Sequence, residues 1–220
     1  MPYEPDTAIG GARHQFPTTR PSLIHAAAAG GPPAREALDA IVALYWKPAY
    51  KHVRMKWRRS NEEAKDLVQG FFTALLEQDI LAKFDPGQAR LRTYLRACLD
   101  RFVMKQDESS QRLKRGGGAV LDFDAAEREL AASGGSPEDI FLREWQREVF
   151  TLAVEDLRAA CDTAGKQVQF RIFEQYDLAD ADRPSYLDLA REHGISAAAV
   201  TNYLAALRRD LRRFVQARSL

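Results

Sequence analysis

Side chains that could donate hydrogen bonds to a nucleic acid gather near the C-terminus of this 220-residue chain. Apolar residues between positions 196 and 213 recur at helical spacing, which predicts an amphipathic helix with one buried stripe. That stripe consists of Val200, Leu204, Leu207 and Leu211. Arginine, hydroxyl and amide groups donate to phosphates and to base edges. The residues of these types expected on the exposed face are Ser196, Thr201, Asn202, Arg208, Arg209 and Arg212.

The residues before this helix predict that it is the second of a helix-turn-helix pair. Ser185 can cap a first helix, with Asp188 as its reciprocal partner three positions later. Gly194 can end that helix in a left-handed conformation, and Ser196 can cap the next one. The alternative is a surface helix with a solvated basic face. Because the capping and packing residues agree, the pattern favours DNA contact.

Charge is distributed unevenly along the chain, although the formal net charge is only +1. The segments 47–59 and 90–115 are mostly basic, whereas the segments 122–129 and 138–155 are mostly acidic. Separate basic segments joined by acidic ones predict two contacts with a polyanion rather than one uniformly basic surface.

Helical spacing extends over most of the remaining sequence, and we find no strand pattern and no internal repeat. Helices are predicted over 35–57, 60–81, 91–105, from 137 onward and over 167–176. Tyr94 lies on an apolar stripe and is expected in the core, and Ser60 with Glu63 predicts a capping box. The expected fold is all-α, with two helical domains joined by a Gly-rich acidic linker. The boundaries are a flexible arm at 1–33, a helical domain at 34–113, the linker at 114–136 and a helix-turn-helix domain at 137–220.

Composition argues against several classes of protein. Cys98 and Cys161 lie on apolar helix faces and are expected to be reduced core residues. No apolar run is long enough to cross a bilayer and no secretory signal is visible, so we expect a cytoplasmic protein without membrane contact. The four histidines lack metal-ligand spacing and stand beside no nucleophile. We therefore expect no enzyme activity, no cofactor and no metal site.

Two blocks of the sequence resemble the extracytoplasmic-function (ECF) sigma factors, the small two-domain members of the bacterial sigma-70 family. The segment KDLVQGFFTALLEQDILAKFDPGQARLRTYLRACLDRF, residues 65–102, resembles region two, and residues 185–215 resemble region four. FPTTRPSLIHAA before the first helix and KRGGG after the third are similar to a branch with an FPTTRWSL start and a DLTQGFF core. The resemblance implies a sigma factor that binds core RNA polymerase and directs promoter-specific transcription initiation.

The resemblance implies that the helix near Asp66 docks on the clamp helices of the largest subunit of core RNA polymerase. Acids at the start of the helix would meet basic residues of the clamp. The positions carried over are Glu62, Glu63, Asp66, Gln69 and Phe72. Lys65 stands where close relatives usually have an acid, so the patch is less acidic than in the family. A phosphate on Ser60 would add negative charge, which is one hypothesis for regulation.

The resemblance also gives each basic segment a role in promoter binding. The third helix and the turn before it are similar to the part that captures the unstacked minus-ten element. The residues expected there are Arg90, Arg92, Arg96, Arg101 and Lys105. The helix at 196–213 would enter the major groove at the minus-thirty-five element. The family often has an asparagine near Arg101 and a basic residue in place of Tyr203, so base reading is expected to differ at these positions.

Two alternatives come from other classes of protein. A one-component helix-turn-helix DNA-binding regulator would explain the C-terminal block but leave residues 65–102 without a role. A sigma-like mimic that titrates an anti-sigma factor would not need the predicted DNA-binding arginines, so their presence argues against it. Relatives are controlled by an anti-sigma factor, a terminal extension or a Ser/Thr kinase. The sequence does not choose among these, and the expected partners are core RNA polymerase, promoter DNA and one such regulator.

Overall fold

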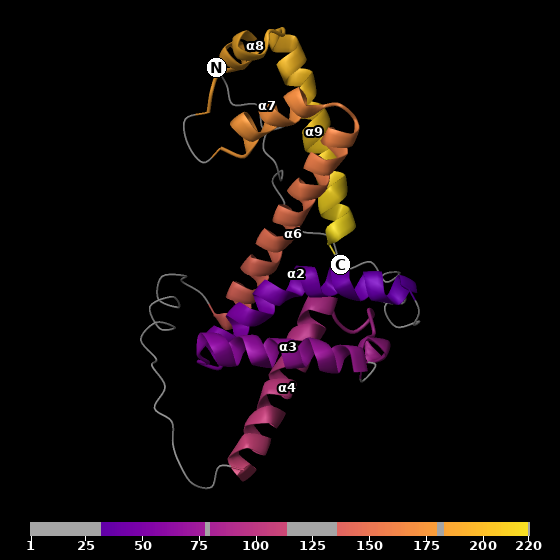
Figure 1. Cartoon of the computed structure of the whole chain (residues 1–220), viewed down its shortest axis with the longest axis vertical. Helices are drawn as coiled ribbons and strands as arrows, with labels where there is room; N and C mark the ends of the chain where they lie inside the picture. Colours follow the sequence, from indigo (N-terminus) through magenta and orange to yellow (C-terminus); the bar gives the residue numbers. More distant parts are fainter. Residues whose placement is uncertain (1–31, 78–79, 114–135, 180–182, 220) are drawn as a thin grey trace. The chain divides into compact units, whose positions relative to one another are not determined.

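The computed structural model describes residues 32–77, 80–113, 136–179 and 183–219, and within these ranges the regular structure is entirely helical (Figure 1). Seven α-helices and one 3-10 helix occur in the described ranges, with no strand. They are α2 (Pro32–Lys56), α3 (Asn61–Glu77), η1 (Ile80–Lys83), α4 (Leu91–Leu113), α6 (Pro137–Thr163), α7 (Gln167–Asp177), α8 (Tyr186–His193) and α9 (Ala197–Arg218). The all-α prediction is confirmed. Nearly all of the predicted arm and linker lies outside the described residues.

Contacts divide the described residues into two units, and the division falls inside α6, between Glu148 and Val149. The first unit comprises α2, α3, η1, α4 and the first half of α6, and the second comprises the second half of α6 with α7, α8 and α9. Helix α6 begins at Pro137, where the sequence predicts a helix, and proline is favoured at this first helical position. The predicted domain boundaries stay a prediction, and the first half of α6 belongs with the helices before it.

The core of the first unit forms where α2, α3, α4 and the first half of α6 turn their apolar faces together. Its large, fully buried side chains come from all four helices: Ile41, Leu44, Tyr45, Phe71, Leu91, Leu99 and Trp145. The ring of Trp46 stacks on that of Phe72, with 5.9 Å between centroids. Leu76 lies at the edge of the apolar stripe of α3 and is 50% exposed.

The predicted capping box at the start of α3 is confirmed. The Ser60 hydroxyl accepts from the backbone N–H of Glu63, at 3.3 Å, and a Glu63 carboxylate oxygen accepts from the backbone N–H of Ser60, at 3.0 Å. The neighbouring Asn61 accepts from the hydroxyl of Tyr50 on α2, at 2.6 Å. These bonds satisfy N–H groups that have no partner inside the helix and fix α3 against α2.

The helix-turn-helix of the second unit forms from the residues that predict it. The Ser185 hydroxyl accepts from the backbone N–H of Asp188, and the Ser196 hydroxyl accepts from that of Ala199, both at 3.1 Å. Gly194 ends α8 with φ of 63° and ψ of 35°, the left-handed conformation that glycine adopts without steric cost. The α9 stripe predicted from helical spacing is buried against α7 and α8. Local chemistry therefore sets both ends of the turn.

Candidate nucleic-acid interface

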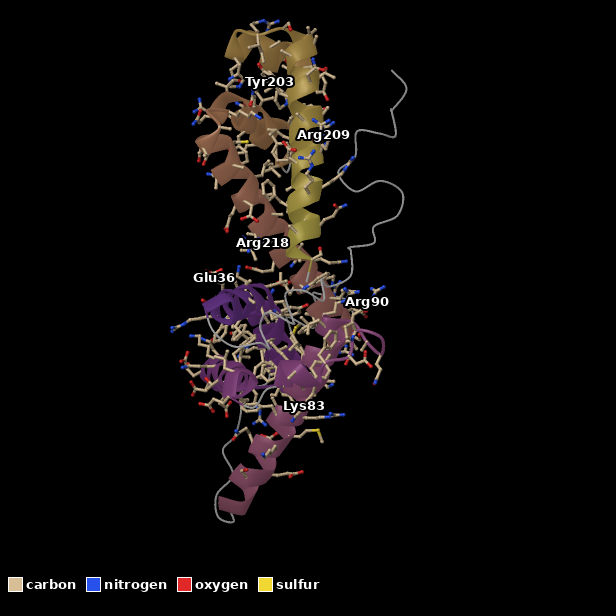
Figure 2. The ribbon with its side chains drawn as sticks, turned by 90° about the vertical axis from the view of Figure 1, so that its right-hand side faces the viewer. Glu36, Lys83, Arg90, Tyr203, Arg209 and Arg218 are labelled. Atoms are coloured by element: carbon tan, nitrogen blue, oxygen red, sulfur yellow. The ribbon has the colours of Figure 1, made fainter. Side chains whose placement is uncertain are left out.

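One face of α9 presents most of the residues that the sequence singled out there. The exposed members of that set are Ser196, Thr201, Asn202, Arg209 and Arg212. Thr201 donates its hydroxyl hydrogen to the carbonyl oxygen of Ala197 in its own helix, at 3.1 Å. The side chains of Asn202, Arg209 and Arg212 form no hydrogen bond or ion pair with any described residue. Figure 2 shows Arg209 on α9 together with Tyr203, which is half-buried against the core of the unit.

Arg208 does not lie on this exposed face, which corrects the sequence-based expectation. Its Nε and Nη2 each donate to a carboxylate oxygen of Asp177, at 2.9 Å. The Arg208 side chain is 9% exposed and the Asp177 side chain is 5% exposed. Position 208 stands at the border of the apolar stripe, so the packing of α7 decides which way the side chain points.

The environment of Arg208 explains why a charge is stable there. Its guanidinium carbon lies 5.8 Å from the ring centroid of Tyr176, and the Tyr176 and Tyr186 rings meet at 4.9 Å in a T-shaped contact. Burial by itself would lower the pKa of Arg208, but the hydrogen bonds and charge of Asp177 raise it above its ordinary value. The pair and the two rings therefore fix the middle of α9 to the end of α7 and the start of α8.

A second arginine clamp, which sequence analysis missed, holds the C-terminal end of α9. Arg218 Nε and Nη2 donate to the carboxylate oxygens of Asp156 on α6, both at 2.7 Å. The bonds from Asp156 raise the pKa of Arg218. The partners are 62 positions apart in sequence. No local pattern links them, so only the packing of α6 against α9 reveals the pair.

The basic residues of α4, together with Arg90 directly before it, divide into an exposed set and a covered set. Arg90, Arg101 and Lys105 are exposed, and their side chains form no hydrogen bond or ion pair with the part of the chain that the structure describes. Arg92 lies with its guanidinium carbon 4.8 Å from the ring centroid of Trp145, and burial lowers its pKa. Arg96 reaches within 3.5 Å of a Glu138 carboxylate oxygen. The first half of α6 therefore covers Arg92 and Arg96.

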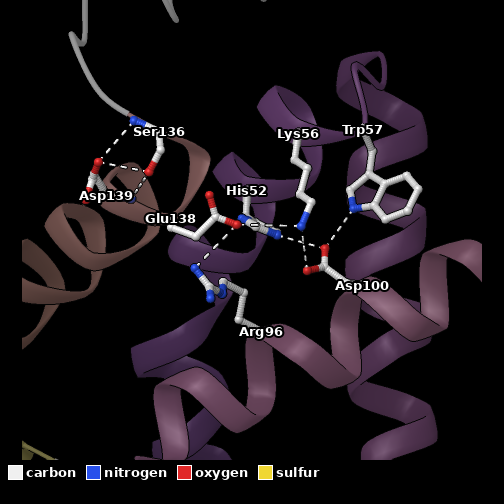
Figure 3. A network of polar contacts seen from close by, with 8 residues as sticks. All are labelled: His52, Lys56, Trp57, Arg96, Asp100, Ser136, Glu138 and Asp139. Atoms are coloured by element: carbon white, nitrogen blue, oxygen red, sulfur yellow. Dashed lines mark hydrogen bonds and ion pairs between the residues drawn. The ribbon is translucent and has the colours of Figure 1, made fainter.

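A polar network under Arg96 joins α2, α4 and the start of α6 (Figure 3). Asp100 accepts from Nε2 of His52 at 2.9 Å, from Nζ of Lys56 at 2.8 Å and from Nε1 of Trp57 at 2.9 Å. Burial by itself would raise the pKa of Asp100, but these bonds outweigh it and hold the pKa well below the usual range. His52 is fully buried. No sequence pattern predicts this network, because Asp100 and the groups that donate to it lie more than 40 positions apart in sequence.

The acidic start of α3 is only partly available to a partner. Glu62, Asp66 and Gln69 are exposed, and Glu63 is half-buried in the capping box. Lys65 Nζ lies 3.0 Å from a Glu62 carboxylate oxygen, so this lysine neutralises a neighbouring acid. Phe72 cannot contact a partner as the resemblance implied. It is 4% exposed and stacks on Trp46 in the core.

A groove of about 360 Å³ runs between the start of α3 and the second half of α4. Asp66 and Glu63 stand on one side of it and Asp107 on the other, and Arg59 forms an ion pair with Asp107. Leu67, Gly70 and Phe102 line its apolar part. A Cβ on Gly70 would stand 3.2 Å from Cζ of Phe102, so the helices approach closely where residue 70 has no side chain.

Tyr94 was expected in the core but is half-buried beside it. Its hydroxyl donates to the carbonyl oxygen of Ile80 at 2.7 Å, and its ring lies 5.2 Å from that of Phe84. Burial raises its pKa to about 12. The side chain therefore ties η1 to the start of α4 rather than presenting a free ring for base stacking.

Together the two units define an all-helical protein with a capped helix-turn-helix and separate exposed basic surfaces. No known family model matches the chain, and neither the curated proteins nor the solved structures compared with it contain a match. Across the residues that the structure describes, no cluster of three or more His, Cys, Asp or Glu side chains could hold a metal ion. None of the helices so described has the length and apolar character to cross a membrane.

Proposed function

We propose that this protein is a dissociable initiation subunit of bacterial RNA polymerase, of the ECF sigma type. It binds core polymerase through the first unit and reads promoter DNA through both units. The observation that carries the proposal is the helix-turn-helix of α8 and α9, whose second helix presents Asn202, Arg209 and Arg212 without internal partners. The order of the two sequence blocks supports it, because a lone helix-turn-helix regulator would leave the first unit without a role.

Each proposed contact uses residues that are exposed. On α9, Asn202 and Thr201 would face base edges, and Arg209 and Arg212 would face bases or phosphates. On α4 and just before it, Arg90, Arg101 and Lys105 would hold the single-stranded minus-ten element. On α3 the polymerase surface would consist of Glu62, Asp66 and Gln69, with Glu63 at its edge. Arg208 is left out of this interface and is assigned a positioning role.

The sigma-like mimic is a second candidate, and one observation favours it. The presence of arginines that a mimic would not need argues against mimicry. Three of those arginines, however, have internal partners: Arg92 lies on Trp145, Arg96 on Glu138 and Arg208 on Asp177. A mimic would keep them for its fold. The test that separates a sigma factor from a mimic therefore depends on Arg209 and Arg212, whose side chains pair with no other described residue.

Promoter-directed transcription in vitro tests the proposal. The chain is added to bacterial core polymerase with a pool of genomic fragments, and transcript starts are sequenced. A sigma factor yields starts that share a two-block upstream motif and that disappear without the protein. A double R209A/R212A variant should lose these starts. The matched control R158A removes a cation from α6 that pairs with Glu174, and it should retain them.

Binding to core polymerase separates the remaining outcomes. A charge reversal at the exposed Asp66, D66R, should weaken co-elution with core polymerase, mainly by slowing association. The control E36K reverses an exposed acid on α2 outside the proposed surface. If the protein binds core polymerase but yields no transcript starts, and if R209A/R212A leaves that binding unchanged, the result would support the mimic. No binding to core would leave only the one-component regulator.

A further inference from the structure

Three acids in the first half of α6 pair with basic residues of α2 and α4. Glu148 lies 2.9 Å from Nζ of Lys47, and Glu144 lies 3.1 Å from Nζ of Lys51. Glu138 reaches Nζ of Lys56 at 3.6 Å and Nη1 of Arg96 at 3.5 Å, as Figure 3 shows in part. Residue numbers rise along α2 as they fall along α6, so the two helices pair in antiparallel order.

These ion pairs are not the main anchor of α6, although their acids are nearly buried. The side chains of Glu148 and Glu144 are 10% and 12% exposed, whereas those of Lys47 and Lys51 are 61% and 33% exposed, and ion pairs that reach solvent contribute little to folding stability. The same segment buries Ile140, Phe141 and Trp145, and burial of large apolar side chains contributes several times more. The apolar residues therefore anchor the first half of α6. The acids of this segment chiefly neutralise the basic side chains of α2 and α4 that it covers.

Without those acids, α2 would present a strongly basic surface. Lys47 and Lys51 are four positions apart, which places them on one side of the helix at about 5–6 Å between Cβ atoms. Arg96 continues this charge toward α4, whereas Lys56 stays hydrogen-bonded to Asp100 at 2.8 Å. Closely spaced cations on one helix side suit the phosphate backbone of a nucleic acid, which carries one charge per strand about every 3.4 Å.

We propose that Lys47 and Lys51 form a second phosphate-backbone surface, the α2 lysine face, and that Glu144 and Glu148 are its built-in competitors. The acids occupy the lysines as phosphates would, so the surface engages nucleic acid only when the acids are displaced or neutralised. The choice of nucleic acid as ligand rests on the proposed function. The ion pairs between α6 and α2 do not depend on the proposed function.

Affinity for single-stranded DNA tests this directly. The probe is a fluorescein-labelled oligonucleotide of mixed sequence, roughly 20 nucleotides long, titrated with the full chain while anisotropy is followed. The isosteric double variant E144Q/E148Q should bind with a Kd roughly tenfold lower at about 50 mM salt, and most of that gain should vanish by about 200 mM. The matched control E36Q/E77Q makes the same charge change at exposed positions of α2 and α3 outside the proposed surfaces and should shift the Kd by no more than about twofold.

A second pair of substitutions separates charge release from structural loosening. K47Q/K51Q alone should change the Kd little, because these lysines are already neutralised. Added to E144Q/E148Q, it should abolish the gain, which loosening of α6 would not predict. If thermal unfolding shows that E144Q/E148Q is destabilised, E144Q alone gives the one-charge version. Equal affinities for E144Q/E148Q and the E36Q/E77Q control, or a gain that survives K47Q/K51Q, would overturn the proposal.

The two proposals fail in different ways. A gain in DNA affinity together with an absence of promoter-directed starts would leave the α2 lysine face standing without the sigma function. Promoter-directed starts without any gain would overturn the α2 lysine face alone.

Discussion

Arg208 of α9 and Asp177, the last residue of α7, form a buried ion pair with two hydrogen bonds, each 2.9 Å long. The pair holds α9 against α7, the helix that precedes the helix-turn-helix. An arginine that the sequence assigns to DNA contact therefore acts inside the protein. Its effect on any ligand would be indirect, through the orientation of α9.

Removing one partner of this pair should strongly destabilise the second unit. R208A leaves Asp177 buried without its counterion, and D177N leaves Arg208 in the same condition, so each should lower the free energy of unfolding by about 3–5 kcal/mol. R208K should recover only part of the loss, because lysine cannot make both bonds. Urea denaturation measures this. The control R213A, at a 70% exposed side chain paired with Asp210, should stay within about 0.5 kcal/mol, and equal losses would refute the clamp.

The Asp100 network should make the first unit sensitive to acid. The pKa of Asp100 in the folded protein is below its ordinary value of 3.8, so its contribution is present above that value and is lost as the pH falls through the folded-state pKa. D100N should cost about 2–3 kcal/mol at neutral pH. The difference from wild type should shrink below about pH 4. Unfolding of both proteins across that range checks this, and a difference independent of pH would contradict it.

A substitution in the turn between α8 and α9 should lower stability through backbone strain alone. Gly194 has φ of +63°, and a Cβ added there would meet no atom within 4 Å. G194A should therefore lower the free energy of unfolding by about 1 kcal/mol through strain alone. G194N should cost less, because asparagine tolerates this conformation. G165A, at φ of +68° after α6, provides an independent comparison in the same unfolding assay. An unchanged G194A would mean that the turn relaxes.

The hydroxyl of Tyr94 should ionise at a higher pH than that of an exposed tyrosine. Burial raises its pKa to about 12, so the absorbance difference at 295 nm between wild type and Y94F should show no step between about pH 9 and 11. Y94F should also cost about 1 kcal/mol, since the carbonyl of Ile80 loses its 2.7 Å hydrogen bond. A step near pH 10 would place the hydroxyl in solvent.

Sequence by itself determined the local structure of this protein. The capping residues, the left-handed glycine and the apolar spacing act within one or two helical turns, so Ser60 with Glu63, Ser185 with Asp188, and Gly194 were predicted with their roles. The all-α fold followed from the same spacing. The exposed Arg209 and Arg212 also followed, because they lie well away from the apolar stripe of α9.

Only the tertiary structure decided which way the side chains at the borders of those stripes point. A border side chain can face solvent or a neighbouring helix, and the neighbour is distant in sequence: Asp177 takes Arg208 inward, and Trp145 takes Arg92. Phe72 lies in the core because Trp46 packs on it. Helical spacing contains no information on which helices meet, so the internal partners of these groups, and the acids of α6 that cover the lysines of α2, become visible only when the helices pack.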